Sequence, residues 1–128
     1  MDLSIVTTVL IIVACLQLKH FICDGPLQTA AMVQKKSIYG APLGILHSGL
    51  HGIGTGLVFL IAGFPALLGL GLAALDFVIH YHVDYTKENV VKYFGWTTQD
   101  AKFWWALSAD QTLHQLTYLI LAAIALRV

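Results

Sequence analysis

The chain has 128 residues, of which 58% are hydrophobic and only 11% are charged, and its mean hydropathy is +0.77. A soluble globular domain carries about a quarter of charged residues, so this composition provides too little polar surface for a water-soluble fold. The formal net charge is zero, which gives no basic surface to neutralise nucleic-acid phosphates and excludes nucleic acid as a partner. We therefore expect one integral membrane domain over residues 1–128, with the lipid bilayer as its solvent.

Four long apolar blocks each approach the roughly 20 residues that a membrane-spanning helix requires. Pro42 and Pro65 begin the second and third blocks, where the first turn of a helix tolerates proline. Gly63-Phe64 leaves only a tight turn between these two blocks. The sequence predicts an all-α, four-helix membrane bundle whose second and third spans are antiparallel neighbours, with spans at about 3–24, 42–62, 65–85 and 103–128.

The first block is expected to be a retained helix. Its N-terminus carries Asp2 and no lysine or arginine, unlike a signal peptide, and Cys15 and Cys23 form no Cys-x-x-Cys metal or redox motif. Pro26 follows the block and lacks a backbone donor. Two readings of Gly25-Pro26 stay open: the first helix kinks after Asp24 and opens a cavity beside it, or it ends there.

The segment between the third and fourth spans mixes apolar and charged residues, which is typical of a short helix lying on the membrane surface. Its residues are Lys87, Glu88, Val90, Val91, Lys92, Tyr93, Phe94 and Trp96. Lysines gather at this end of the spans, whereas the opposite end has only Arg127. By the positive-inside tendency the lysine-bearing side is cytoplasmic, which predicts a multi-pass protein of a cell inner membrane with both termini on the non-cytoplasmic side.

Each block contains one pair of polar side chains spaced by four residues, so that both members lie on one helix face, one turn apart. Ionisable groups inside a membrane are costly and need partners. All four pairs lie in the span halves nearest the lysine-bearing side, which predicts one shared site. The pairs are His20 with Asp24, His47 with His51, Asp76 with His80, and Asp110 with His114.

Counting about 1.5 Å per residue from the span ends arranges these side chains in two layers, provided that residues 27–33 continue the first span. The shallow layer is Asp24, His47, His80 and Asp110, and the deep layer is His20, His51, Asp76 and His114. Imidazole and carboxylate donors on facing helices suit a divalent metal ion, zinc first, with manganese or iron as alternatives. His82 and Asp84 are expected to be solvated near the membrane surface. A structural network of Asp-His hydrogen bonds and a proton or ion path remain alternatives to a metal site.

These motifs also carry a resemblance to a known family. His20-Phe21-Ile22-Cys23-Asp24 with Leu27-Gln28, the paired histidines, Asp76 before His80, and Asp110-Gln111-x-x-His114 make the chain similar, from about Leu16 to Leu121, to small bacterial membrane proteins catalogued as domain of unknown function 3307. The resemblance implies a membrane protein of bacterial or phage origin. It implies no established activity.

Two functions from different classes follow from the residues. In the first, a metal-dependent hydrolase, a bound ion activates water and polarises a phosphoryl or acyl oxygen, and a spare carboxylate acts as general base. In the second, the protein is a non-catalytic accessory or scaffold subunit of a larger membrane complex or homo-oligomer, and the polar pairs hold its helices together. A small transporter is a third hypothesis, motivated by Pro26.

Overall fold

The computed structural model describes residues 3–127, and within this range the chain forms five helices and no strand, which confirms the all-α class. Met1, Asp2 and Val128, the last residue of the fourth predicted span, lie outside the described residues. The helices are α1 (Leu3–Asp24), α2 (Ala30–Lys35), α3 (Pro42–Ile61), α4 (Ala66–Phe94) and α5 (Ala101–Ala125). Each predicted span thus overlaps one of the four long helices, although α4 and α5 extend beyond the predicted bounds, and α2 is an additional short helix.

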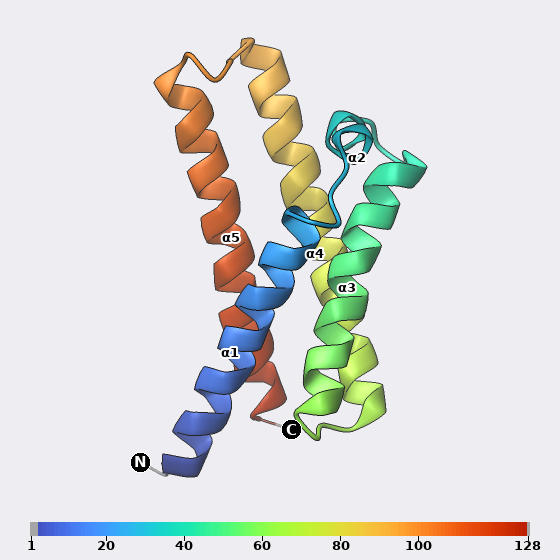
Figure 1. Ribbon diagram of the computed structural model, residues 1–128, viewed down its shortest axis with the longest axis vertical. Helices are drawn as coiled ribbons and strands as arrows, with labels where there is room; N and C mark the ends of the chain where they lie inside the picture. Colours follow the sequence, from blue (N-terminus) through green and yellow to red (C-terminus); the bar gives the residue numbers. More distant parts are fainter. Residues whose placement is uncertain (1–2, 128) are drawn as a thin grey trace.

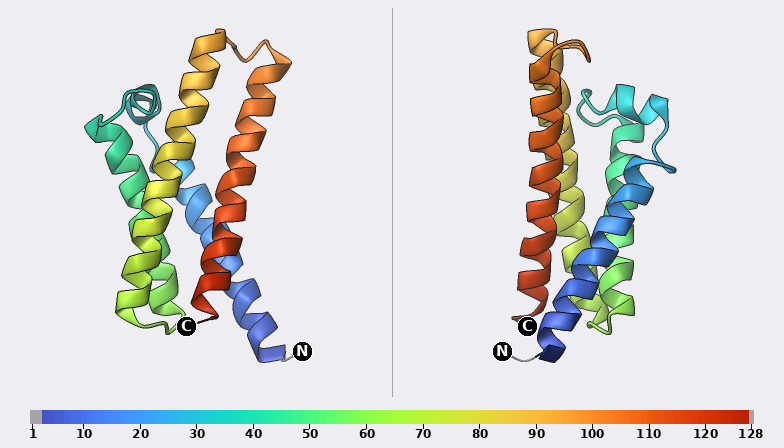
Figure 2. Two further views of the ribbon diagram at one scale, coloured as in Figure 1. Left: turned by 180° about the vertical axis from the view of Figure 1, so that it is seen from behind. Right: turned by 60° about the vertical axis from the view of Figure 1, so that its left-hand side comes forward.

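The long helices run up and down the long axis of the molecule (Figure 1). α3 and α4 form an antiparallel hairpin, and Gly63 makes its turn with a φ of 88°, a conformation that glycine adopts without a steric penalty. α5 returns along α4, while α1 crosses obliquely and packs against α3 and α5. The two ends of the chain lie at the same end of the molecule (Figure 2).

α4 corrects the prediction of a separate helix on the membrane surface. The segment from Lys87 to Phe94 continues α4 without a break, because it contains neither glycine nor proline and its side chains permit the helix to propagate. Gly95 then ends α4 in the left-handed conformation, with a φ of 65°. α5 begins after Asp100, whose carboxylate accepts a hydrogen bond from the backbone N–H of Thr97 at 2.7 Å.

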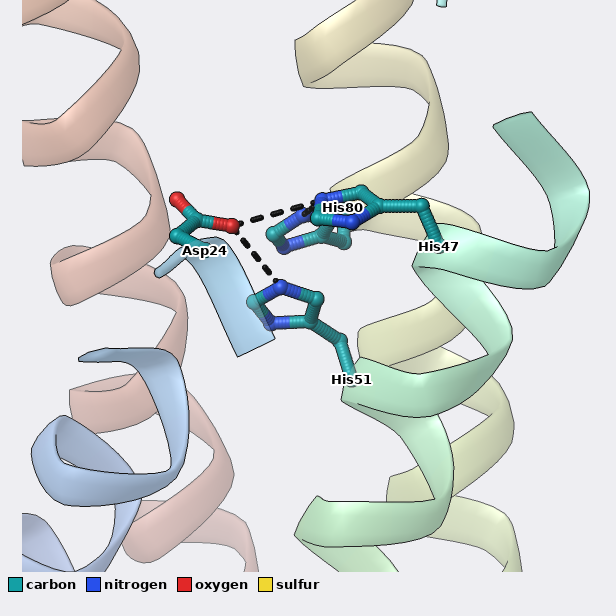
Figure 3. A group of neighbouring side chains, drawn as sticks. All are labelled: Asp24, His47, His51 and His80. Atoms are coloured by element: carbon teal, nitrogen blue, oxygen red, sulfur yellow. Dashed lines mark hydrogen bonds and ion pairs between the residues drawn. The ribbon is translucent and has the colours of Figure 1, made fainter. Parts of the chain in front are cut away.

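Of the two interpretations of Gly25-Pro26, the structure supports the end of the first helix and not a kink within it. α1 ends at Asp24, and a turn leads to α2, whose first turn is capped by the Thr29 hydroxyl accepting from the Met32 N–H at 3.2 Å. Residues 27–33 therefore do not continue the first span, because Pro26 lacks the N–H that another turn of α1 would use. Asp24 is left at the helix end, with its carboxylate turned toward α3 (Figure 3).

Close packing between α3 and α4 depends on small residues. A Cβ at Gly52 would lie 2.9 Å from the Ala73 carbonyl oxygen and 3.1 Å from the Phe77 Cβ, so only glycine permits this approach of the two helices. At the end of the molecule where the chain termini lie, α1, α3, α4 and α5 share an apolar core. Its largest members are Ile12, Leu16, Phe59, Leu72, Tyr118 and Leu121.

Three helices, α1, α3 and α4, are long and apolar enough to cross a membrane. Their outer faces expose large apolar side chains, such as Leu18 and Phe21 on α1 and Leu67 on α4, which is 82% exposed. A soluble monomer rarely exposes so continuous an apolar surface, and we conclude that this is a membrane protein. α5 is less apolar than these three because it carries Asp110, Gln111, His114 and Gln115.

Candidate metal centre

Five histidines from four helices meet inside the molecule. The imidazole ring of His80 on α4 stacks between those of His51 on α3 and His114 on α5, at centroid distances of 3.6 and 4.0 Å. The ring of His47 lies 4.9 Å from that of His51, and the ring of His20 on α1 lies 5.2 Å from it. All five side chains are buried. The structure thus brings the histidines of all four predicted pairs into one buried cluster, and their role as metal ligands stays a prediction.

The first group of converging donors comes from three helices (Figure 3). Asp24 Oδ1 lies 3.0 Å from His51 Nε2 and 3.3 Å from His47 Nε2. His80 Nε2 lies 3.3 Å from His47 Nε2. One donor atom from each of these four residues lies within 4.8 Å of all the others, a separation at which the four could hold one metal ion.

These separations agree with the geometry of a tetrahedral ion. Zinc binds imidazole nitrogen and carboxylate oxygen at about 2.0 to 2.2 Å, and the corresponding edge of a tetrahedron is about 3.3 to 3.6 Å. The two distances that involve His47 Nε2 are both 3.3 Å. The 3.0 Å between Asp24 Oδ1 and His51 Nε2 is shorter than such an edge. The two separations that involve His47 therefore match the size that a zinc ion requires.

A second group shares His80 with the first. His80, Asp84 and His114 also place one donor atom each within 4.8 Å of the others. Asp84 Oδ1 lies 3.2 Å from His114 Nε2, and its Oδ2 lies 3.4 Å from both His80 Nε2 and His47 Nε2. The two groups are thus continuous, and His80 lies at their junction.

Asp84 corrects the sequence prediction, which placed it in solvent. Its side chain is only 5% exposed, and Lys36, at the end of α2, forms an ion pair with its Oδ2 at 2.7 Å. Asp84 is buried because it lies one helical turn after His80 and therefore on the same face of α4. His82 is exposed, as predicted, and its Nδ1 lies 2.7 Å from the Val78 carbonyl oxygen.

His20 lies beside both groups but belongs to neither. Lys19 Nζ donates to the Tyr118 hydroxyl at 3.1 Å, and that hydroxyl lies 2.6 Å from His20 Nδ1. An ammonium group only donates, so the hydroxyl is free to give its own hydrogen to Nδ1. His20 then carries its proton on Nε2, which faces Gln111 Oε1 at 2.9 Å and Asp24 Oδ2 at 3.0 Å. In this arrangement His20 orients Asp24.

Asp76 is directed away from the histidine cluster. Its Oδ2 accepts hydrogen bonds from Lys19 Nζ at 2.9 Å and from the Thr55 hydroxyl. Lys19 is 7% exposed and Asp76 is 1% exposed. The alkyl chain of Lys19 passes Gly54, where a Cβ would lie 2.5 Å from Lys19 Cγ. A buried ion pair thus lies directly beneath the histidines and links α1 to α4.

Asp110 lies at the edge of the cluster. Its Oδ1 is 3.4 Å from His114 Nε2, and its Oδ2 accepts from Gln111 Nε2 at 3.2 Å. Together with Asp24, it lines a pocket of about 290 Å³. This pocket lies between the turn after α1 and the halves of α4 and α5 next to the loop that connects them, which we call the loop-side halves. Asp110 is therefore a carboxylate that faces both the histidines and an open space.

The proposed arrangement in two layers is wrong. It required residues 27–33 to continue α1, and α1 ends at Asp24. Instead, the histidine rings contact one another in a single cluster. The carboxylates of Asp24, Asp84 and Asp110 contact these rings, whereas Asp76 pairs with Lys19.

Sequence reasoning missed Lys19 and Lys36 as members of the site. Lys19 could have been found, because a lysine within an apolar span is as costly as an aspartate and requires an anionic partner. Lys36 could not, since Gly25-Pro26 marks the end of α1 but does not give the direction in which the chain continues to α2.

Comparisons with known proteins identify a family and no activity. No curated protein and no solved structure matches the chain. A family profile described as "Protein of unknown function (DUF3307)" matches residues 9–128, which is nearly the whole chain and includes every residue of the histidine cluster. The chain therefore belongs to the DUF3307 family.

Proposed function

We propose that this protein is a four-span membrane protein that binds a divalent metal ion between its helices and uses it for hydrolysis. The observation that carries the proposal is the convergence of four donor atoms, from Asp24, His47, His51 and His80, within 4.8 Å of one another. Buried imidazole nitrogens and a carboxylate favour zinc, with manganese or iron as alternatives. His114 and Asp84 extend the donor set, and His20 orients Asp24.

α5 is proposed as the fourth span. It lies alongside α4 (Figure 2), and its polar residues Asp110 and His114 face the cluster, while Leu119 and Ile120 are exposed on its outer face. A span that lines a polar site has a lower mean hydropathy without leaving the membrane. We further propose a bacterial inner membrane with the lysine-bearing loops in the cytoplasm; the location of both chain ends at one end of the molecule supports an even number of spans.

The charges within the cluster support a divalent ion. Four carboxylates (Asp24, Asp76, Asp84 and Asp110) lie between the helices, and two ammonium groups, Lys19 and Lys36, pair with Asp76 and Asp84. With neutral histidines, two negative charges remain without a lysine partner. Uncompensated charge in a low-dielectric environment is costly, and one divalent cation neutralises it.

The hydrolytic part of the proposal depends on Asp110 and the adjoining pocket. A bound ion would supply an acidified water molecule and polarise a phosphoryl or acyl oxygen. Asp110 belongs to neither donor group, yet its carboxylate lines the 290 Å³ pocket beside Asp24. A carboxylate in that position can accept a proton from attacking water as general base.

Elemental analysis of the protein purified in detergent tests the metal site. We expect about one zinc per chain and a rise in melting temperature on adding zinc to chelator-treated protein. The variant His47→Ala should lose both effects, while the control variant His82→Ala should keep them. The proposal fails if the wild-type protein contains no metal and neither zinc nor manganese binds or raises its melting temperature.

A scaffold function is the second candidate, and the buried ion pairs favour it. Lys19 with Asp76 and Lys36 with Asp84 connect α1 to α4 and α2 to α4 without any ion, and Asp-His hydrogen bonds can do the same between the remaining helices. If the scaffold reading is correct, His47→Ala lowers stability or disrupts assembly into a homo-oligomer or larger complex, and chelators leave the melting temperature unchanged.

A further inference from the structure

A groove between α4 and α5 opens on the outer surface of the protein. Its volume is about 540 Å³, and it is formed mainly by apolar side chains, among them Ile79, Val83 and Val90 on α4 and Ala109 and Leu113 on α5. Its α5 wall includes the small side chains of Ala106 and Ala109 beside Asp110 and Leu113. The groove lies in the loop-side halves of the two helices, next to the histidine cluster and on the side that would face lipid.

Two lysines lie toward the α4–α5 loop, one in the groove and one in its extension. Lys87 lines the groove itself. A second hollow of about 430 Å³, lined by Trp96, Lys102 and Trp105, shares Val90 and Ala106 with it and extends it toward the loop. Tryptophan and lysine at the end of an apolar groove are typical of the level of the lipid headgroups. The groove therefore has an apolar interior, and its end near the α4–α5 loop is lined by lysine and tryptophan.

The groove also adjoins the polar pocket of the candidate metal centre. Lys87 and Asp110 line both the 540 Å³ groove and the 290 Å³ pocket, which also contains Asp24 and Gln111. Lys87 therefore lies at the boundary between the groove and the pocket, where its side chain is 17% exposed and forms an ion pair with Glu88. A molecule in the groove would thus place its polar end within reach of Asp110 and the metal donors.

We infer that the groove binds an acyl chain of an anionic phospholipid and presents the phosphate of its headgroup, at Lys87, to the site beside Asp110. This inference rests on the proposed function and assigns its substrate class. The apolar groove matches a hydrocarbon chain, Lys87 and Lys102 match an anionic headgroup, and phosphate oxygen is a good ligand for the proposed ion. The lipid reaches the site from the bilayer, so that no path for a large soluble substrate is needed.

Photolabelling in lipid nanodiscs tests the groove. The probe is phosphatidic acid with a photoactivatable group on one acyl chain, and phosphatidylcholine with the same chain is the reference lipid. We expect several-fold stronger labelling of the α4–α5 segment, residues 78–113, by the phosphatidic acid probe. Ala109→Phe should fill the groove and remove most of this labelling, whereas Ala123→Phe, at an exposed alanine of α5 that lines none of these hollows, should not.

The headgroup contact is tested by charge. Lys87→Gln should reduce the preference for phosphatidic acid over phosphatidylcholine several-fold, and Lys92→Gln, on the same helix but exposed and away from the groove, should leave it unchanged. Equal labelling by both lipids in the wild-type protein, or equal labelling of Ala109→Phe and Ala123→Phe, would overturn the inference. Loss of labelling on adding inorganic phosphate, without any effect of Ala109→Phe, would overturn it too.

Zinc content, measured on the same samples, separates this inference from the proposed function. If Ala109→Phe and the wild type both contain zinc and are labelled equally, the groove assignment fails while the metal site stands. If neither contains zinc, but Ala109→Phe loses the labelling and Lys87→Gln loses the lipid preference, lipid binding stands while the metal site fails.

Discussion

His47 on α3 and His80 on α4 direct their Nε2 atoms at each other across 3.3 Å. Two imidazole nitrogens in this position repel through their lone pairs unless a proton or a metal ion lies between them. A shared proton bridges only these two rings, whereas an ion would also engage the Asp24 and His51 donors beside them.

Replacing His80 should weaken metal binding more than replacing any other histidine, because His80 alone belongs to both donor groups. We expect His80→Ala to lower zinc affinity by at least about 100-fold, more than the 10- to 100-fold loss typical of an outer-shell residue. Competition titration with a chromogenic chelator measures this. His82→Ala, two residues away and exposed, is the control, and equal affinities of the two variants would contradict the assignment.

Asp84→Asn should lower zinc affinity as well, by about 10- to 100-fold. The carboxylate contacts His47, His80 and His114, and its loss also leaves Lys36 as a buried cation without its anionic partner. The same titration measures the effect. Asp100→Asn removes an exposed carboxylate that accepts hydrogen bonds from Thr97 before α5 and should leave zinc affinity unchanged. If Asp84→Asn also binds zinc normally, Asp84 is only a partner of Lys36.

Lys19→Met should destabilise the protein by about 3 to 5 kcal/mol, because it leaves the Asp76 carboxylate buried without its cation. The second change, Asp76→Asn, removes that charge, so the double variant Lys19→Met/Asp76→Asn should recover a large part of the lost free energy of unfolding. Unfolding in detergent mixtures gives the four values of the double-mutant cycle. Additive losses would show that the 2.9 Å pair is not energetically coupled.

Gly52→Ala should destabilise the α3–α4 hairpin by about 1 to 3 kcal/mol, the usual cost of overpacking. Its Cβ would lie 2.9 Å from a backbone oxygen of α4. Gly49→Ala is the matched control on the same helix, because a Cβ there meets nothing within 4 Å, and it should cause no loss of stability. The same unfolding assay measures both variants, and equal stabilities would mean that α3 and α4 are farther apart.

Cysteine labelling in intact cells tests the proposed topology. In a background with Cys15→Ser and Cys23→Ser, a membrane-impermeant maleimide should label Arg127→Cys from the non-cytoplasmic side and leave Lys92→Cys unlabelled. Permeabilised cells should give labelling at both positions. The opposite pattern would reverse the orientation, and labelling of both positions in intact cells would show that α5 does not cross the membrane.

The sequence was sufficient for the positions of the long helices and for most of the cluster. The lengths of the apolar blocks predicted the bounds of α1 and α3 to within one residue. Proline gives a steric signal at one end of each helix, since Pro26 follows the end of α1 and Pro42 begins α3. Spacing by four residues found His47, His51 and His114, because helical periodicity fixes the face on which they lie. These features depend only on local geometry, and local geometry is encoded in neighbouring residues.

What the sequence did not predict depends on how helices rotate and cross. Asp76 and Asp84 lie on the same face of α4, and nothing in their spacing tells which contacts the histidines; the oblique crossing of α1, which brings Lys19 to Asp76, makes that choice. The sequence also predicted a boundary between the third span and a surface helix, and this boundary does not exist in α4. A helix continues through a polarity change unless glycine or proline stops it, and here none occurs before Gly95.

The length of α4 has a consequence for the membrane itself. Its 29 residues extend about 43 Å at 1.5 Å per residue, which exceeds the roughly 30 Å thickness of a hydrocarbon core. The hydrocarbon core takes about 20 of these residues, and the polar end of α4, with Lys87, Glu88 and Lys92, would extend into the headgroup region. His80 and Lys87 lie on this one uninterrupted helix, so their axial separation stays at about 10 Å. α4 would therefore hold the histidines at a constant depth below a headgroup bound at Lys87.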